Sequence, residues 1–298
     1  MSSYTSLRRY YLLFEKVSKS HFPSFVDIQS YFRENDIEIS DRTLQRDVNH
    51  LRSDFGIEIA YDKQRNGYFI DNEMSINPEV FLRFLEVVAT AEMFHSSIKE
   101  SKDSLKFIQF ENVGSLKGIE YLPVLLKAIK ENKCIRFKHY NFHNDTLKNY
   151  QIEPYMLKEY QNRWYVVGKP ENMQEFRTFG IDRISELHIV DLSFMRTTEN
   201  PAEFFENVVG LTWHSFEMDK VGFQVFKPDD KYIKTLPIHP SQHIVAETDE
   251  STTFEIQVII NYELVQRLLM LGSACKVESP ASLVEQIRKI VEEMGGFY

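Results

Sequence analysis

The chain is poor in the residues that mark several large classes of protein. It has two cysteines among 298 residues, Cys134 and Cys275, and their wide separation argues against a disulfide framework. Its 11 glycines include no glycine-rich loop of the kind that cradles phosphate in nucleotide-acting enzymes. No apolar run approaches the ~20 residues of a membrane-spanning helix, and the first residues lack the apolar segment of a secretion signal. These absences predict a cytoplasmic protein with no membrane contact.

Motifs for catalysis and for metal binding are also missing. The sequence has neither clustered Cys/His zinc spacing nor a serine-centred nucleophile motif. His139 and His143 are four residues apart, but on a strand leading into a turn this spacing gives no shared ligand face. We therefore expect no catalytic residue, no metal and no cofactor. The alternative is an enzyme that acts on nucleotides, and the absence of these motifs argues against it.

The remaining composition is that of an ordinary globular protein. Hydrophobic residues make up 43% of the chain and charged residues 27%, which is typical of folded rather than disordered chains. The length predicts several domains, and we place them at 1–72, 73–118, 119–195 and 196–298. A net charge of −9 argues against a protein coated in basic residues, although DNA binding requires only a local basic face.

The first 72 residues carry the signals of three helices followed by a β-hairpin. Apolar side chains recur at helical spacing over 7–17, and Ser24 and Ser40 can cap a second and a third helix. The third helix is expected to run to about Arg52. Short alternating segments on either side of a polar turn at 62–67 then predict two paired strands. This order is typical of a winged helix-turn-helix domain.

The third predicted helix has two chemically different faces. Leu44, Val48 and Leu51 fall within about 60° of one another on one side, and polar side chains fall on the opposite side. Arginine, asparagine and glutamine can make bidentate hydrogen bonds to base edges in the major groove. The alternative is an ordinary amphipathic helix with a solvated face. The predicted DNA contacts are Arg42, Thr43, Gln45, Arg46 and Asn49 on this helix, and Lys63 and Arg65 at the hairpin tip.

The stretch 161–184 predicts a second hairpin, in which arginines alternate with aromatic residues. A cluster of turn formers at 168–172 separates two short apolar runs. A guanidinium beside an aromatic ring can bind phosphate or carboxylate while a base stacks on the ring. The alternative is that the arginines form surface ion pairs with Asp182 and Glu175. The candidate ligand-binding residues are Tyr140, Arg163, Tyr165, Arg177, Phe179 and Arg183.

The segments 163–166 (RWYV) and 176–184 (FRTFGIDRI) resemble the signature of WYL-domain proteins, with Val166 in place of the namesake leucine. The segments 135–140 and 153–157 extend the resemblance, which covers roughly 120–195. It implies a small SH3- or Sm-like β-barrel that senses a nucleotide or a single-stranded nucleic acid. Such domains usually follow a winged helix-turn-helix domain, and the helix beginning at Ser40 resembles the recognition helix of those domains.

The C-terminal part alternates strands and helices in the order β-α-β-β-α-β-α over 217–294, which fits a ferredoxin-like unit. It resembles the extension that often follows WYL domains, for which the family implies a role in dimerisation or ligand gating. The whole chain is thus predicted to be an α+β multidomain, ligand-responsive transcriptional regulator. It would bind a double-stranded DNA operator as a homodimer. The alternative is an interaction protein whose winged domain does not read DNA.

Overall fold

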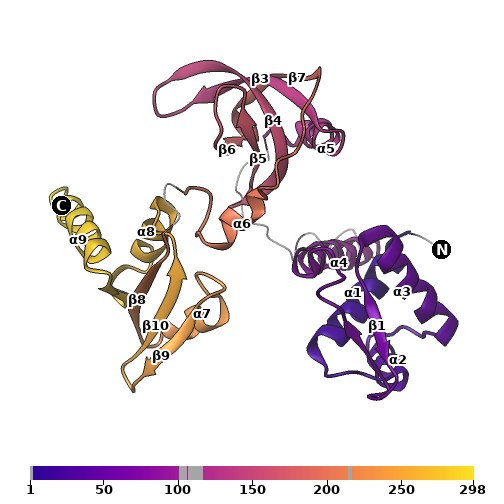
Figure 1. Ribbon diagram of the computed structural model, residues 1–298. Helices are drawn as coiled ribbons and strands as arrows, with labels where there is room; N and C mark the ends of the chain where they lie inside the picture. Colours follow the sequence, from indigo (N-terminus) through magenta and orange to yellow (C-terminus); the bar gives the residue numbers. More distant parts are fainter. Residues whose placement is uncertain (1–2, 101–105, 107–116, 214–216) are drawn as a thin grey trace. The chain divides into compact units, whose positions relative to one another are not determined.

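The computed structural model is a mixed α+β structure and describes residues 3–100, 106, 117–213 and 217–298 (Figure 1). The chain divides into two compact units, Met1–Asn112 and Val113–Tyr298. Residues 101–105 and 107–116 of the predicted linker lie outside the described residues. In the described part of the chain, no helix is both long enough and apolar enough to cross a membrane.

Over residues 3–100, the first unit contains four α-helices and a two-stranded antiparallel sheet. Its elements are α1 (Ser3–Lys19), α2 (Phe25–Glu34), α3 (Asp41–Phe55), β1 (Ile59–Asp62), β2 (Gly67–Ile70) and α4 (Pro78–Glu100). Both predicted caps are confirmed, because the side chains of Ser24 and Ser40 accept hydrogen bonds from the backbone amides of Asp27 and Thr43. Gly56 ends α3 in the left-handed conformation, with a φ of 66°.

The core of the first unit lies among its helices. Leu44 and Leu51 of α3 are fully buried, as the helical periodicity predicted. Phe81 and Leu85 of α4 join the same hydrophobic cluster, and α4 lies beside α1 (Figure 1). The N-terminal part of α4 is therefore packed into the core of this unit and does not form a free linker.

A buried ion pair ties α1 to α3. Arg9 Nε donates to Asp47 Oδ2 at 2.7 Å, and Arg9 Nη2 donates to Asp47 Oδ1 at 2.9 Å. The Asp47 side chain is only 1% exposed. Its hydrogen bonds raise the pKa of Arg9 although burial opposes this. Asp47 thus fixes how α3 is seated against α1.

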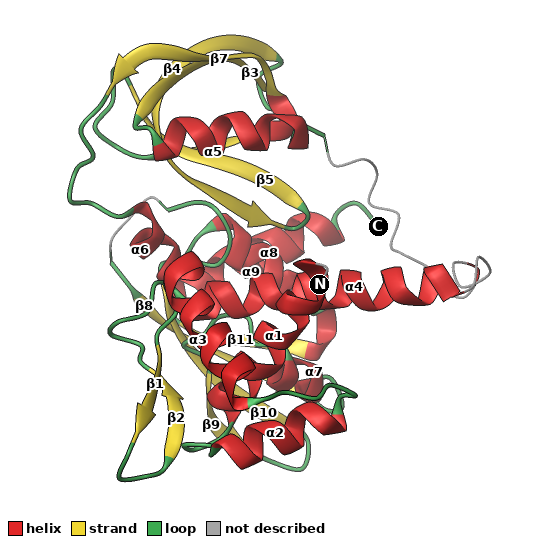
Figure 2. Cartoon of the chain, turned by 90° about the vertical axis from the view of Figure 1, so that its right-hand side faces the viewer, coloured by secondary structure: helices red, strands yellow, loops and turns green. Residues whose placement is uncertain are grey.

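The second unit begins with a helix packed on a five-stranded antiparallel sheet of order β6-β5-β4-β3-β7 (Figure 2). Its elements are α5 (Leu122–Lys130), β3 (Lys133–Asn141), β4 (Thr146–Tyr160), β5 (Arg163–Pro170), β6 (Arg177–Gly180), the 3-10 helix η3 (Ile181–Arg183) and β7 (Ile184–Ser193). The predicted hairpin is confirmed, because β5 pairs with β6 in a register that sets Tyr165 opposite Gly180. Strand β4 has 15 residues and extends well beyond the 153–157 segment of the resemblance.

The C-terminal part of the second unit is built on a four-stranded antiparallel sheet of order β11-β8-β10-β9. Its elements are α6 (Pro201–Glu206), β8 (Asp219–Phe226), α7 (Asp230–Thr235), β9 (His243–Glu247), β10 (Ser251–Val258), α8 (Tyr262–Leu269), the 3-10 helix η4 (Gly272–Ala274), β11 (Cys275–Ser279) and α9 (Ala281–Gly295). The predicted order of strands and helices is confirmed. Helix α6, which Asn200 caps, was not predicted.

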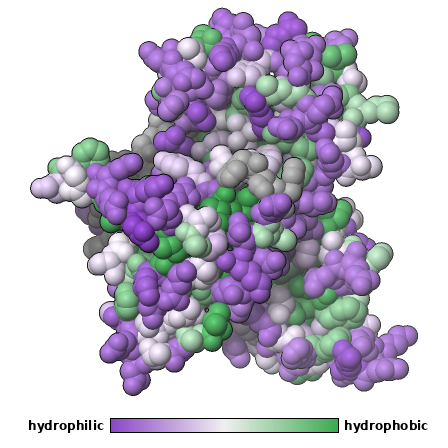
Figure 3. All heavy atoms as spheres, turned by 60° about the vertical axis from the view of Figure 1, so that its left-hand side comes forward, coloured by the Kyte–Doolittle hydropathy of each residue, from purple (hydrophilic) through white to green (hydrophobic). Residues whose placement is uncertain are grey.

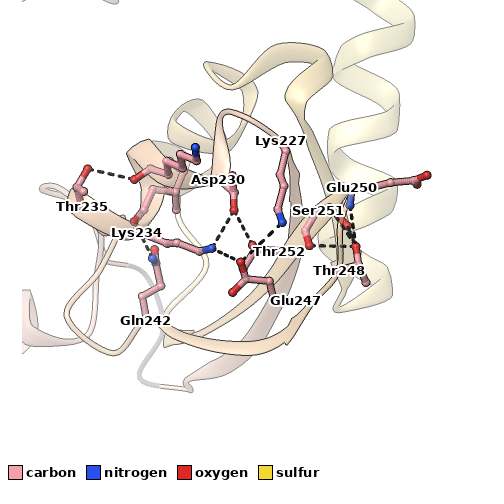
Figure 4. A network of polar contacts seen from close by, with 12 residues as sticks. Lys227, Asp230, Lys234, Thr235, Gln242, Glu247, Thr248, Glu250, Ser251 and Thr252 are labelled. Atoms are coloured by element: carbon pink, nitrogen blue, oxygen red, sulfur yellow. Dashed lines mark hydrogen bonds and ion pairs between the residues drawn. The ribbon is translucent and has the colours of Figure 1, made fainter.

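A polar network holds α7 on this sheet (Figure 4). Lys234 donates to Asp230 at 2.9 Å and to Glu247 of β9 at 2.8 Å. Thr252 of β10 donates to Asp230 at 2.7 Å, and Lys227 lies 3.8 Å from Glu247. The two lysines and two carboxylates balance in charge, so the network has a structural role.

Hydrophilic side chains dominate the face seen in Figure 3, and hydrophobic ones reach it in small groups.

Asn261 anchors the start of α8 to the segment that follows α6. Its side-chain oxygen caps α8 by accepting from the amide of Leu264 at 2.8 Å. Its amide nitrogen donates to the carbonyl oxygens of Val209 at 2.7 Å and Thr212 at 2.8 Å. The Asn261 side chain is buried, so these three bonds make it a rigid connection within the second unit.

Candidate nucleic-acid and ligand sites

The outer face of α3 presents the predicted DNA-reading residues to solvent. Arg42, Gln45, Arg46 and Asn49 are exposed, and Thr43 is half-buried. Since Leu44, Val48 and Leu51 of the same helix are buried, one face of α3 holds the core and the other is available for contacts.

The residues of this face differ in how far they are already engaged. Thr43 shares a hydrogen bond of 2.9 Å with Ser40, so its hydroxyl belongs to the helix cap. Gln45 Nε2 donates to the hydroxyl of Tyr68 in β2 at 3.3 Å. Arg46 Nε lies 3.9 Å from Asp47, yet its side chain is 49% exposed. Within the described structure, Arg42, Arg46 and Asn49 are the predicted contacts most available to a ligand.

The tip of the β1–β2 hairpin is held in a defined shape. Asp62 Oδ1 accepts from the backbone amides of Gln64 at 2.8 Å and Arg65 at 3.1 Å. The guanidinium of Arg65 lies over the ring of Phe22, 4.2 Å from its centroid, and Lys63 is exposed. The sequence reading placed Arg65 at the tip but missed Phe22, which lies far from it in the chain. This contact holds the Arg65 side chain in a defined position.

A second cluster of basic and aromatic side chains lies around η3. Arg163 Nη1 donates to Asp182 Oδ2 at 3.3 Å, and Arg183 Nε is 3.7 Å from Asp182 Oδ1. The Arg183 guanidinium lies over the ring of Phe142, 5.4 Å from its centroid. The Tyr140 ring is 5.6 Å from Phe142. One carboxylate is thus shared by two arginines beside two exposed or partly exposed rings.

The side chains of Asp182 and Arg183 in this cluster pack directly against the backbone of Gly180. A Cβ atom at Gly180 would lie 2.6 Å from Asp182 Oδ1 and 2.8 Å from Arg183 Nε. Both distances are shorter than a van der Waals contact allows, so a larger residue would displace these side chains. Three buried polar atoms next to this glycine have no hydrogen-bond partner among the described residues: His139 Nε2, Asp182 Oδ1 and Arg183 Nε. Unpaired buried polar atoms are rare, and a bound polar group can satisfy them.

Burial keeps the His139 imidazole neutral. Burial, and then the positive charge of Arg183, lowers its pKa to about 4, while Asp182 acts in the opposite direction. Phe179 packs against its ring with a centroid distance of 5.5 Å. At neutral pH the positive charge of the cluster therefore comes from its arginines.

The other predicted ligand residues lie in different places. Phe179 is only 4% exposed and packs against Phe137 and Tyr150, so it is a core residue and offers no free ring. Tyr165 is half-buried opposite Gly180, and its burial raises its pKa.

Arg177 lies at the far end of the β5–β6 pair from Arg163. It pairs with Gly168, five residues along β5 from Arg163, which corresponds to about 17 Å. There it lines a groove of about 480 Å³ with Phe204 and Trp213. The structure therefore brings Arg163, Tyr165 and Arg183 together and separates Arg177 from them. Tyr140 borders this cluster through Phe142.

Sequence reasoning missed part of the η3 cluster. Asp182 was considered only as an ion-pair partner, His139 only as a metal ligand, and Phe142 and Gly180 received no role. The signal for Gly180 is its place inside the 176–184 signature. Within the described residues, no group of three or more His, Cys, Asp or Glu side chains is arranged to hold a metal ion.

Two domain families match the second unit. A WYL domain matches residues 120–189, and a WCX domain matches residues 220–295. The second unit therefore carries a WYL domain followed by a WCX domain. Comparison with curated proteins gives no significant match.

The solved structures similar to the chain include two that differ in how much of their own length the chain covers. Proteasome accessory factor B/C (PafBC) of Arthrobacter aurescens has 15% identity and a TM-score of 0.33, covering 96% of this chain and 46% of that chain. The present chain thus spans less than half the length of PafBC. A CRISPR Cas-related protein has 15% identity and a TM-score of 0.41, covering 99% of this chain and 85% of that chain.

Proposed function

We propose that the protein is a sequence-specific DNA-binding transcriptional regulator whose WYL domain senses an anionic ligand. In this proposal the first unit is a winged helix-turn-helix domain, with α3 as recognition helix and the β1–β2 hairpin as wing. The five-stranded sheet forms a small SH3- or Sm-like barrel, and the β11-β8-β10-β9 sheet with its helices forms a ferredoxin-like unit. The protein acts as a homodimer and has no catalytic role.

The observation that carries the DNA-binding proposal is the division of α3 into a buried and an open face. Leu44, Val48 and Leu51 hold the helix in the core, while Arg42 and Arg46 point away from it. A helix seated in this way can enter the major groove without losing its packing. The ordered Arg65 at the hairpin tip supports a phosphate contact beside it.

The ligand proposal rests on the η3 cluster. Arg163 and Arg183 share the single carboxylate of Asp182, so the cluster retains a positive charge. The partly exposed rings of Tyr140 and Phe142 offer surfaces on which a base can stack. This combination suits a nucleotide or a single-stranded nucleic acid. Such a ligand alters DNA binding only if it prefers one conformation of the regulator.

DNA binding can be tested by fluorescence anisotropy on the DNA upstream of the protein's own gene, at two salt concentrations. We expect tight binding that weakens steeply with salt, because phosphate contacts release counterions. Arg46→Ala should abolish sequence preference. Arg288→Ala is the matched control, since it removes the same charge from α9, and it should bind like the wild type. Equal affinity of Arg46→Ala and wild type for every DNA would refute the assignment of α3.

Ligand binding can be tested with short single-stranded DNA and with mononucleotides in the same assay. Arg183→Ala should remove the response and leave basal operator binding unchanged. Arg136→Ala is a control on β3 of the same sheet, where the side chain bonds Gln151. Arg177→Ala distinguishes the η3 cluster from the groove beside Trp213. If this variant alone loses the response, the ligand binds in the groove. Turnover of the nucleotide would favour the rival enzyme.

A further inference from the structure

Helix α4 has a second apolar face that the first unit does not cover. Phe81 and Leu85 are buried in the core, whereas Val80, Phe84 and Val87 are 68%, 44% and 58% exposed. At 100° per residue these three exposed side chains lie within about 60° of one another, on a stripe turned away from the core-facing one. Three large apolar side chains exposed on one helical stripe are typical of a surface that binds another protein.

We infer that this face pairs two copies of the chain through antiparallel α4 helices. The inference rests on the proposed regulatory function, because a two-fold DNA site calls for a two-fold protein. With the two-fold axis at Phe84, this ring meets its own copy, and Val80 of each helix lies within about one residue (~1.5 Å along the axis) of the level of Val87 of the other. The stripe is therefore complementary to itself in the antiparallel direction.

The charges beside the stripe support the same register. Arg83 and Glu86 flank it on one side and already form an ion pair of 3.0 Å within the helix. In an antiparallel pair the corresponding flanks of the two helices face each other, so Arg83 of one copy lies beside Glu86 of the other. The contact is repeated by the symmetry. In a parallel pair the flanks that carry Arg83 and Glu86 would instead lie on opposite sides of the contact, and this charge pairing between the two copies would be lost.

The size of the stripe predicts a weak dimer in the absence of DNA. A single pair of helices buries less than the about 800 Å² per partner that a stable complex buries. We therefore expect a dissociation constant in the micromolar range. Two adjacent half-sites on DNA would strengthen the association by raising the local concentration.

Sedimentation velocity of the full-length protein over a range of concentrations tests the inference. Phe84→Glu should raise the dimer dissociation constant by at least about tenfold, because it puts charge at the centre of an apolar contact. Val26→Glu is the matched control, since Val26 is 66% exposed on α2 of the same unit, and it should leave the dimer unchanged. Arg83→Glu should weaken the dimer, and adding Glu86→Arg should restore it.

A cysteine at the axis provides a direct readout. Phe84→Cys should form a disulfide-linked dimer under mild oxidation, whereas the wild type should not. A monomer at every concentration, or a dimer indifferent to both Phe84 variants, would overturn the inference. So would protection of the introduced thiol from alkylation in a monomer, because the chain's own residues would then cover the face. If Arg46→Ala loses DNA binding but still dimerises, the result bears on the recognition helix and not on this interface.

Discussion

The buried histidine beneath the η3 cluster should make the stability of the second unit depend on pH. Burial lowers the pKa of His139 from an ordinary value of 6.5 to about 4 in the folded protein. The unfolded chain therefore binds this proton below pH 6.5, whereas the folded protein binds it only near pH 4. Between these values the unfolded state holds more protons, so the free energy of unfolding must fall as the pH falls.

The magnitude follows from the difference between the two pKa values. A change from 6.5 to about 4 corresponds to at most about 3 kcal/mol of stability, lost between pH 6.5 and pH 4. His139→Phe should remove this slope. The new ring would lie among Phe137, Tyr150 and Phe179, whose rings already surround the imidazole, and it leaves no unpaired nitrogen.

The assay is urea unfolding of the wild type and of His139→Phe at a series of pH values. The difference between the two profiles isolates His139, because the carboxylates titrate in both proteins. NMR titration of the imidazole provides an independent check, with the other histidines as internal references. Parallel stability profiles between pH 4 and pH 7, or an imidazole that titrates near 6.5, would refute the reasoning.

Four further substitutions test the contacts described above. Asp47→Asn should destabilise the first unit by about 3–5 kcal/mol in chemical unfolding, because it leaves Arg9 buried without its anion. Gly180→Ala should cost about 1–3 kcal/mol and weaken ligand binding, since its Cβ would displace the side chains of the η3 cluster. Asp182→Asn should tighten the binding of a phosphate-containing probe by about threefold to tenfold in a titration, because one competing negative charge is removed. Asn261→Ala should destabilise the second unit by about 2–3 kcal/mol in thermal unfolding, through loss of a helix cap and two buried hydrogen bonds.

Much of the fold could be predicted because its signals are local. Ser24 and Ser40 each cap a helix by accepting a hydrogen bond from the amide three residues later, so the signal lies within one turn of the chain. The structure has both caps. The C-terminal order of strands and helices follows in the same way from short alternating or helical runs. The predicted turn at 168–172 was placed too early, because 168–170 belong to β5 and the connection to β6 covers 171–176.

The sites were harder to predict because their parts are distant in sequence. Asp47 pairs with Arg9 from another helix, and nothing near Asp47 in the sequence signals this. Arg177 and Arg163 belong to one hairpin, yet the strand register sets them at opposite ends of it. Phe142 comes from the turn after β3 and meets Arg183 only through the tertiary fold. Periodicity showed which face of an element each residue occupies but could not show what lies opposite.

The charge of the η3 cluster limits what kind of anion can bind there. With His139 neutral, the cluster consists of two arginines and one carboxylate, a local charge of +1. An anionic ligand must compete with Asp182 for Arg163 or Arg183. A compact dianion would bring two negative charges to a cluster with one uncompensated positive charge, and the Asp182 carboxylate would repel it. A phosphodiester carries one charge per phosphate and brings a base that can stack on Phe142. In the proposed ligand site, the balance of charge and the exposed ring thus favour a nucleic-acid strand over a free phosphate.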